Sequence, residues 1–255
     1  MRTWPAARTV LLSLLAVLPW ALAGPAAVRA QQRGGASSAR DTAPIDLTGY
    51  WVSYVTENWR YRMVTPTPGD YQGVPMNLAA RQVADAWDPA KDEAAGEQCK
   101  SYGAPALLRV PERLHITWED DQMLREETDA GMQTRLFHFG DWKASGGPRT
   151  WQGDSVARWE TAGSRGGPPR SGSLRVTTTH LRAGYLRKNG VPYSEDATLT
   201  EYYDLAKERN GDVWLVVTIA VQDPKYLTQQ FVISSQFKKQ ADGSGWDPTP
   251  CSSRW

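Results

Sequence analysis

Residues 197–222 read ATLTEYYDLAKERNGDVWLVVTIAVQ, two runs of β-branched and aromatic residues around an Asn-Gly pair. Such runs favour strands, and Asn210-Gly211 is typical of the tight turn that joins two antiparallel strands. The stretch therefore predicts a β-hairpin. Asn189-Gly190 and Asp242-Gly243 are further turn signals on either side of it.

The same pattern continues in both directions from this hairpin. Arg113–Glu119 alternates, with Leu114, Ile116 and Trp118 on one face. The other expected strands are 51–57, 58–64, 123–128, 132–139, 155–160, 173–181 and 231–238. About ten short strands with mostly short connections predict an all-β antiparallel up-and-down barrel, which leaves no open sheet edge.

The segment 76–98 has a helical pattern instead. Asn77 can cap a helix, and Asp88-Pro89 ends or kinks one. The apolar residues of one helical face are Ala79, Val83, Ala86 and Trp87. We therefore expect a short helical insertion after the second strand.

Residues 1–30 are typical of a secretory signal peptide. Arg2 and Arg8 lie before or beside a short apolar run over 10–18, and two small-residue cleavage patterns follow it. The run is too short to anchor the chain in a membrane. We therefore expect a periplasmic or secreted protein that is not embedded in a membrane.

The polar residues 31–45 predict a disordered leader, so the folded barrel domain should span 46–255. The chain has 29 basic and 28 acidic residues, and removal of Arg2, Arg8 and Arg29 with the signal peptide leaves 26 basic ones. This near balance argues against nucleic acid as a partner. A small molecule is the expected partner, and the oligomeric state is left open.

The chain has two cysteines, Cys99 and Cys251. In an oxidising compartment two lone cysteines usually pair, so a disulfide between them is predicted. Two free thiols are the alternative. A shared metal is disfavoured because neither cysteine has a neighbouring ligand at zinc spacing.

The opening of the first expected strand carries a family resemblance. Residues 46–51 read DLTGYW, and this Gly-x-Trp resembles the start of lipocalin-like (calycin) barrels. That resemblance implies a barrel in which Trp51 closes one end, although the helical segment lies earlier in this chain than in that family. Over 46–251 the chain also resembles a group of exported bacterial proteins without an assigned function, which implies a barrel but no catalytic residues. The stretches that carry this second resemblance are 118–121, 184–190, 223–228 and 248–251.

Strand parity directs the search for a site. Residues two apart share a face, and the apolar face of a small barrel points inward. Four consecutive strands between Met132 and Leu205 are therefore expected to place polar or aromatic groups inside. These are His138, Trp159, Thr178, His180, Glu201 and Tyr203. His115 falls on a polar outer face, and Phe137 and Phe139 alternate against the placement of His138.

Two imidazoles and a carboxylate inside a barrel allow three kinds of chemistry. His138, His180 and Glu201 can bind a metal, or act as general acid and base with Tyr203 as a donor. They can also hydrogen-bond a ligand or simply one another, as an internal network that fixes the strand register. No cofactor is predicted, and a metal at these three residues is left open.

Two further features are candidate ligand contacts. Arg60 and Arg62 share one face of 58–64 and can clamp a carboxylate or a phosphate, unless that face is a solvated exterior. The hairpin connection from Tyr185 to Tyr193 can cap the barrel mouth and gate a ligand, unless it is an ordinary turn.

Three functions follow as hypotheses. The first is an exported lipocalin-like barrel that binds a small hydrophobic or aromatic molecule in its lumen. The alternative is a cofactor-independent lyase, isomerase or hydrolase that uses His138, His180 and Glu201. The third is a structural or interaction protein of the cell envelope. The sequence does not decide whether the protein is an enzyme.

Overall fold

The computed structural model describes residues 37–144, 146–162 and 171–254, so the signal peptide expected at 1–30 lies outside the described residues. The barrel strands are β1 (Gly49–Ser53), β2 (Arg113–Asp120), β3 (Met123–Thr128), β4 (Thr134–His138), β5 (Asp154–Ala162), β6 (Ser171–Thr179), β9 (Thr198–Lys207), β10 (Val213–Gln222) and β11 (Phe231–Lys239). A separate two-stranded sheet consists of β7 (Gly184–Tyr185) and β8 (Pro192–Tyr193). The helices are α1 (Trp59–Arg62), α2 (Leu78–Asp85), α3 (Pro89–Ala94), the 3₁₀ helix η1 (Gln98–Tyr102) and α4 (Ala104–Leu107).

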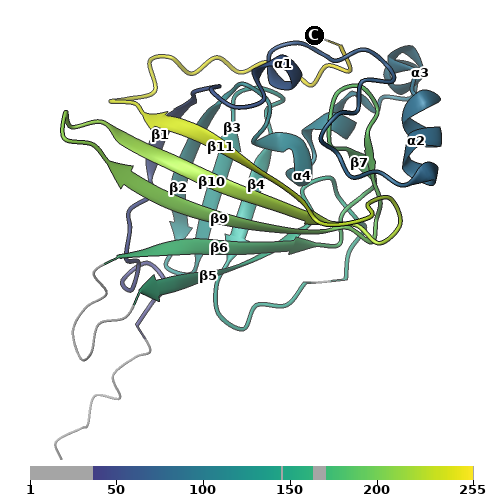
Figure 1. Ribbon diagram of the computed structural model, residues 1–255. Coiled ribbons are helices and arrows are strands. Elements are labelled where there is room, and N and C mark those ends of the chain that lie inside the picture. Colours follow the sequence, from purple (N-terminus) through teal and green to yellow (C-terminus); the bar gives the residue numbers. More distant parts are fainter. Residues whose placement is uncertain (1–36, 145, 163–170, 255) are drawn as a thin grey trace, which may run out of the picture. The chain divides into compact units, whose positions relative to one another are not determined.

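Within the described ranges, nine strands close one barrel in the order β1-β11-β10-β9-β6-β5-β4-β3-β2 (Figure 1). The predicted all-β barrel is confirmed at this level, and it is compatible with the lipocalin-like resemblance. Its strand pairs are antiparallel except β4 and β5, which run parallel. A parallel pair requires a crossover, which residues 139–153 provide, so the predicted up-and-down meander is interrupted there.

The second expected strand, 58–64, is wrong, since its centre forms α1. Asn58 adopts a left-handed conformation (φ 49°) and turns the chain out of the sheet. The turn makes Arg62 a buried residue while Arg60 stays exposed. The helical insertion is confirmed, but it follows the first strand: Asn77 Oδ1 caps α2 by accepting from Ala80 N, and Asp88 caps α3.

Alternating inward residues build the core. Leu114 and Ile116 of β2 are buried as predicted. Trp51 is fully buried on β1, where its Nε1 donates to Leu47 O at 2.9 Å. A second aromatic group, Trp118 with Phe139 and Trp159, packs with ring centroids 5.5 to 6.4 Å apart.

Residues 37–45 belong to the fold, so this part of the predicted disordered leader is wrong. Trp159 Nε1 donates to Ala39 O at 2.7 Å, and Ala39 is buried. Burial of this apolar contact and its hydrogen bond compensates for ordering a short polar segment.

The predicted disulfide between Cys99 and Cys251 is confirmed, with Cα atoms 5.1 Å apart. It joins the C-terminal segment to η1, and Gly131 N donates to Thr249 O beside it. Among the described residues, no helix has the length and apolar composition needed to cross a bilayer.

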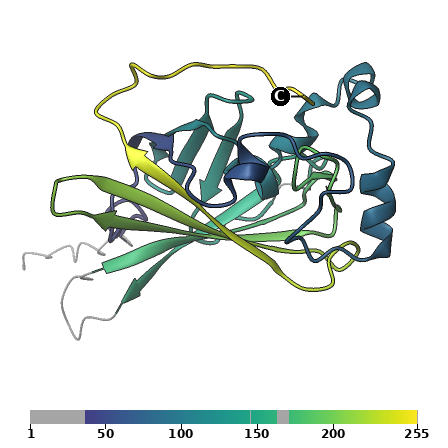
Figure 2. The same ribbon diagram turned by 45° about the horizontal axis from the view of Figure 1, so that its top comes forward.

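The short helices gather at one end of the barrel together with β7 (Figures 1 and 2). All four residues of α4 are buried there. Gly103, which precedes α4, leaves no room for a side chain: an added Cβ would lie 2.1 Å from Tyr193 Oη. The residues at the helical end of the barrel are therefore tightly packed. Arg109, two residues after the end of α4, is buried among them.

Candidate functional site

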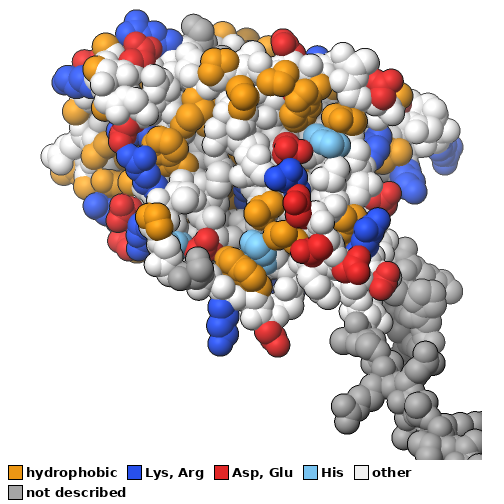
Figure 3. Space-filling view, turned by 180° about the vertical axis from the view of Figure 1, so that it is seen from behind, with side chains coloured by type: hydrophobic (Ala, Val, Ile, Leu, Met, Phe, Trp, Pro, Cys, Tyr) orange, Lys and Arg blue, Asp and Glu red, His pale blue; other side chains and the backbone are white. Residues whose placement is uncertain are grey.

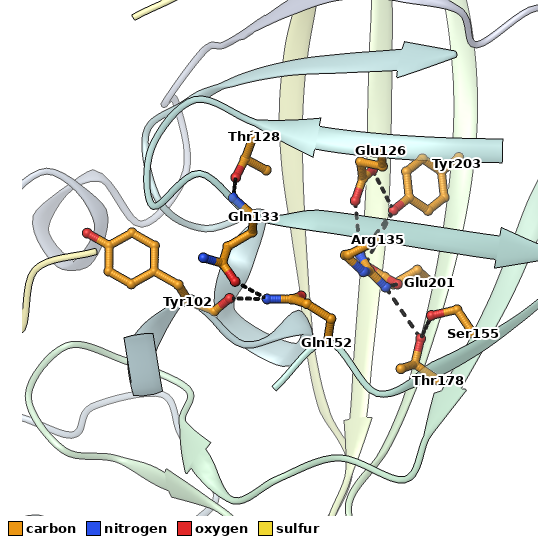
Figure 4. Close-up of polar contacts among 10 residues, drawn as sticks. All are labelled: Tyr102, Glu126, Thr128, Gln133, Arg135, Gln152, Ser155, Thr178, Glu201 and Tyr203. Atoms are coloured by element: carbon orange, nitrogen blue, oxygen red, sulfur yellow. Dashed lines mark hydrogen bonds and ion pairs between the residues drawn. The ribbon is translucent and has the colours of Figure 1, made fainter. Parts of the chain in front are cut away.

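A buried ionic network spans the barrel lumen around Arg135 (Figure 4). Its Nη1 donates to Glu126 Oε1 at 3.1 Å and to Glu201 Oε1 at 2.9 Å. Tyr203 Oη donates to Glu126 Oε2 at 2.9 Å. On the other side, Arg135 Nη2 reaches Thr178 Oγ1 at 3.4 Å. These partners come from β3, β4, β6 and β9, so the network fixes the register of four strands.

This network has more carboxyl groups than cations. Burial raises the pKa of Glu126 to about 7, helped by the neighbouring Glu201 and opposed by Arg135. Burial also raises the pKa of Tyr203 well above its ordinary value. The lumen can therefore hold a proton on Glu126 near neutral pH.

Glu112 is a third lumen carboxyl, and it stands outside that network. It shares the inward parity of Leu114 and Ile116 and is only 5% exposed. Neither of its carboxyl oxygens has a hydrogen-bond partner among the described residues. Burial, with repulsion by Glu126 and Asp129, raises its pKa well above the ordinary value. Glu112 is therefore a buried carboxyl with no hydrogen-bond partner among the described residues, and its surroundings favour the protonated form.

A cluster of buried cations lies at the helical end of the barrel. Arg62, Arg109, Arg187 and Lys188 line a cavity of about 20 Å³, and each is at most 6% exposed. The rest of the lining is Tyr61, Ser101, Ala106, Val110 and Leu186. We call this the arginine pocket. Its free volume holds about one water molecule.

Arg62 has a full set of partners. Its Nε donates to Arg109 O at 2.9 Å and its Nη2 donates to Ser53 Oγ at 3.0 Å. Its Nη1 pairs with Glu57. Arg62 therefore fixes the backbone of Arg109 and is not itself short of a counter-ion.

Arg109 and Arg187 lack such partners. Within the described residues, Nη1 and Nη2 of Arg109 and Nε and Nη1 of Arg187 are buried without a hydrogen bond. Each guanidinium stacks on a ring: Arg109 lies 5.6 Å from the Phe231 centroid and Arg187 lies 4.4 Å from the Tyr61 centroid. Stacking occupies the face of a guanidinium and leaves its edge donors available.

The charges of the pocket repel one another. Burial lowers the pKa of Arg109 to about 9, and the nearby Arg187 and Arg62 contribute to the decrease. Burial likewise lowers the pKa of Arg187. Glu57 attracts Arg109 and Asp70 attracts Arg187, but neither carboxylate forms a direct ion pair with that arginine among the described residues. A buried charge without a close counter-ion is costly, so an anion is the chemical partner that this pocket lacks.

The connection between β7 and β8 carries Arg187 into the pocket. The predicted tight turn is present, since Gly190 N donates to Arg187 O. Unlike an ordinary hairpin tip, residues 186–191 are buried. Asn189 Nδ2 donates to Thr67 O and Asp70 O at 3.3 and 3.0 Å, which ties the turn to the preceding segment. Lys188 Nζ donates to Tyr102 Oη at 2.7 Å, and burial lowers the Lys188 pKa to about 8.

Four predicted site residues do lie on the inner face. Thr178, Glu201 and Tyr203 are fully buried, and Trp159 packs against the core. Thr178, Glu201 and Tyr203 belong to the Arg135 network (Figure 4). The ligand-binding and catalytic roles predicted for these residues stay predictions.

The inward placement of His138 is wrong. On β4, Arg135 and Phe137 are buried, so the alternate residues Leu136 and His138 face outward. His138 stacks on Trp142 with ring centroids 3.9 Å apart, and burial lowers its pKa.

The inward placement of His180 is also wrong, because this residue follows the end of β6. It adopts a left-handed conformation (φ 57°), and its Nδ1 lies 2.9 Å from Asp154 Oδ2. The structure therefore does not bring His138, His180 and Glu201 together. The described part of the chain contains no group of three or more His, Cys, Asp or Glu side chains placed to hold a metal.

The paired clamp of Arg60 and Arg62 is wrong for the same reason as the strand. On the helix α1 these two side chains diverge: Arg60 is exposed and pairs with Asp70 at 2.7 Å, whereas Arg62 is buried. Tyr193 is fully buried, and burial raises its pKa. Tyr185 is partly buried with its pKa raised to about 12 by burial and Asp92. Neither tyrosine lines the arginine pocket.

Arg109, Arg135 and Glu112 were not expected from the sequence. The alternation of Arg135 with Phe137 and Phe139 was a usable signal, and so was the parity of Glu112 with Leu114. Nothing local marks Arg109, because its burial depends on α4 and β11 meeting at the end of the barrel.

On the rear face of the molecule, hydrophobic side chains gather along the upper part, and several acidic side chains lie together toward the lower right (Figure 3). Neither a family model nor a curated protein nor a solved structure matches this chain.

Proposed function

We propose that this protein is an exported barrel that binds a small anion in the arginine pocket. The observation that carries the proposal is the pair Arg109 and Arg187, each of which has two guanidinium nitrogens buried without partners in the described residues. A bound carboxylate or phosphate would accept from these donors and offset the mutual repulsion of the cations. The disulfide between Cys99 and Cys251 is consistent with an oxidising compartment.

The proposal keeps a ligand-binding barrel and changes the expected ligand. A hydrophobic molecule in the lumen has less support, because the inner faces hold closely packed side chains such as Phe137, Tyr203 and Phe237, all at most 1% exposed. The cavity of about 20 Å³ favours a ligand of few atoms. The Tyr61 ring lies 4.4 Å from the Arg187 guanidinium and 5.5 Å from that of Arg60, and its hydroxyl group donates to Gln72 Oε1 at 2.9 Å. A ligand larger than a water molecule requires lining side chains such as Tyr61 to move.

Isothermal titration calorimetry on the purified protein tests this idea. Phosphate, sulfate, acetate and succinate are titrated at constant ionic strength in a chloride buffer. We expect saturable binding of at least one anion, and at least about a tenfold loss of affinity in Arg109→Met and in Arg187→Met, since charge-assisted hydrogen bonds contribute about 1.5–3 kcal/mol each. Arg60→Met is the matched control, because Arg60 is exposed and does not line the cavity.

Thermal unfolding without ligand separates loss of binding from loss of fold. Arg109→Met removes a buried charge that has no direct ion-pair partner among the described residues, so its Tm should equal or exceed that of the unmodified protein. The stabilisation by added anion should disappear at the same time. Absence of saturable binding for every anion, or equal weakening by Arg60→Met, would overturn the proposal.

A further inference from the structure

We infer that the arginine pocket binds a single halide ion, chloride, with Arg109 and Arg187 as the main donors. This inference rests on the proposed function, and it narrows the ligand from any small anion to a monatomic one. It depends on the size of the cavity, on the chemistry of its lining and on the contacts that hold the lining in place.

The size of the cavity favours a monatomic ion. Its free volume of about 20 Å³ holds about one water molecule. A chloride ion is a sphere only slightly larger than a water molecule, whereas acetate, sulfate and phosphate each contain several non-hydrogen atoms. Chloride therefore fits with small adjustments of the lining, and a polyatomic anion requires a lining side chain such as Tyr61 to move out of the way.

The chemistry of the lining favours an ion over a water molecule. The polar side chains that line the cavity are Tyr61, Arg62, Ser101, Arg109, Arg187 and Lys188. All of them carry hydrogen-bond donors, only the two hydroxyl groups can also accept, and no carboxylate or amide side chain of the described residues lines this cavity. A water molecule has to donate both of its hydrogens, whereas chloride only accepts. Chloride is therefore the better match among occupants of this size.

Arg109 and Arg187 supply the donors that the fold leaves unused. Each is 5% exposed, and each has two guanidinium nitrogens without a hydrogen-bond partner among the described residues. The rings of Phe231 and Tyr61 lie over the two guanidinium groups, so the edge donors remain available to an ion. A chloride ion in the cavity that both arginines line would accept charge-assisted hydrogen bonds and reduce the repulsion between the two cations.

Contacts outside the cavity hold both arginines in place. Arg62 Nε donates to Arg109 O at 2.9 Å, and Asn189 Nδ2 donates to two backbone carbonyl groups, which anchors the turn that begins at Arg187. Of the lining residues that the structure describes, all except Tyr61 are buried. The cavity is therefore fixed on most sides, and replacement of the Tyr61 ring should widen it.

Thermal unfolding in a gluconate buffer tests the inference. Chloride, bromide, acetate and sulfate are added at constant ionic strength. Gluconate, which is too large for the cavity, replaces the chloride of the calorimetric buffer because chloride would compete with the added anions. We expect a saturating rise of Tm with chloride and with bromide. Half of the rise should occur at a concentration at least about ten times lower than for acetate or sulfate, because extra atoms in a packed site are costly.

Variants locate the ion and test the size limit. Arg109→Met and Arg187→Met should each raise the half-saturating chloride concentration at least about tenfold, whereas Arg60→Met should leave it unchanged. Tyr61→Ala should remove most of the preference for chloride over acetate. Its matched control is Tyr54→Ala, which removes an exposed ring that does not line the cavity and should keep the preference. In crystals of the unmodified protein soaked in bromide, anomalous scattering should place a bromide ion in the arginine pocket.

The outcomes separate this inference from the proposed function. If acetate or sulfate acts on the unmodified protein at concentrations as low as those of chloride, the inference is overturned and the proposed anion site stands. A chloride effect that never saturates, or that persists in both methionine variants, would also overturn it, because the ion would then act elsewhere. Absence of any effect of these anions in gluconate would overturn both proposals.

Discussion

Glu126 illustrates how a single buried carboxyl makes stability depend on pH. In the folded chain its pKa is about 7, against an ordinary value of 4.5. Between these values the folded state binds more protons than the unfolded state, so the free energy of unfolding falls as pH rises and the full cost is reached above pH 7.

We therefore expect Glu126→Gln to have a shallower loss of stability from pH 4.5 to 7 than the unmodified protein. The difference should be at most on the order of 3 kcal/mol. Urea unfolding at a series of pH values measures it. Glu119→Gln is the exposed control, and an unchanged slope in Glu126→Gln would contradict the assignment of this proton to the Arg135 network.

At the residue scale, strand parity predicted inward placement well when apolar residues agreed along a strand. Glu201 and Tyr203 follow Leu199 on β9, and Thr178 follows Val176 on β6, and all are buried. On β4 each face of the strand carries one apolar and one polar residue. Arg135 shares a face with Phe137, and Leu136 shares the other face with His138, so the local pattern does not say which face points inward. The structure resolves the conflict because Glu126 and Glu201 provide the counter-charges that allow Arg135 to be buried. Those partners lie on other strands and are invisible in the local pattern.

At the element scale, the turn between β7 and β8 carries the arginine pocket. Gly190 has a positive φ of 83°, and an added Cβ would lie 2.3 Å from Trp87 Cβ. Close packing against Trp87, two residues after the end of α2, thus holds the turn that presents Arg187. The Asn-Gly pair predicted the turn but not its burial, since burial is set by the helices that cover it.

Gly190→Ala should consequently be destabilising by about 2–4 kcal/mol, from backbone strain and the collision with Trp87. Anion affinity should fall as well, because Arg187 is displaced. Gly211→Ala is the matched control: Gly211 also has a positive φ (90°), but nothing lies within 4 Å of its added Cβ. Gly211→Ala should lose only the unfolding free energy that comes from backbone strain, about 1 kcal/mol. Equal losses of unfolding free energy in urea would refute the contact with Trp87.

At the scale of the whole molecule, the closure of the barrel could be predicted from the sequence, but the path of the chain between its strands could not. Alternating strands such as β2 and the hairpin of β9 and β10 specify an antiparallel sheet, and closure removes its edges. The parallel pairing of β4 and β5 depends on where residues 139–153 cross the barrel. The helix α1 forms in place of the strand predicted at 58–64, and there Arg62 contacts Glu57 and Ser53. Both are tertiary effects that act over and above local propensity.

The disulfide is the long-range restraint on this architecture. Cys99 and Cys251 are 152 residues apart, so their bond closes most of the described chain into one loop. In the chain-entropy account a loop of this length stabilises by about 5 kcal/mol, and measured values are commonly 2–5 kcal/mol.

Cys99→Ser and Cys251→Ser should each lower the unfolding free energy by an amount within that range. The double variant should lose no more than either single variant, because each single change already removes the same cross-link. The comparison is made by urea unfolding of the three variants. Additive losses would mean that the cysteines stabilise the fold separately, through contacts such as the one between Cys251 and Gln133, and not through the bond.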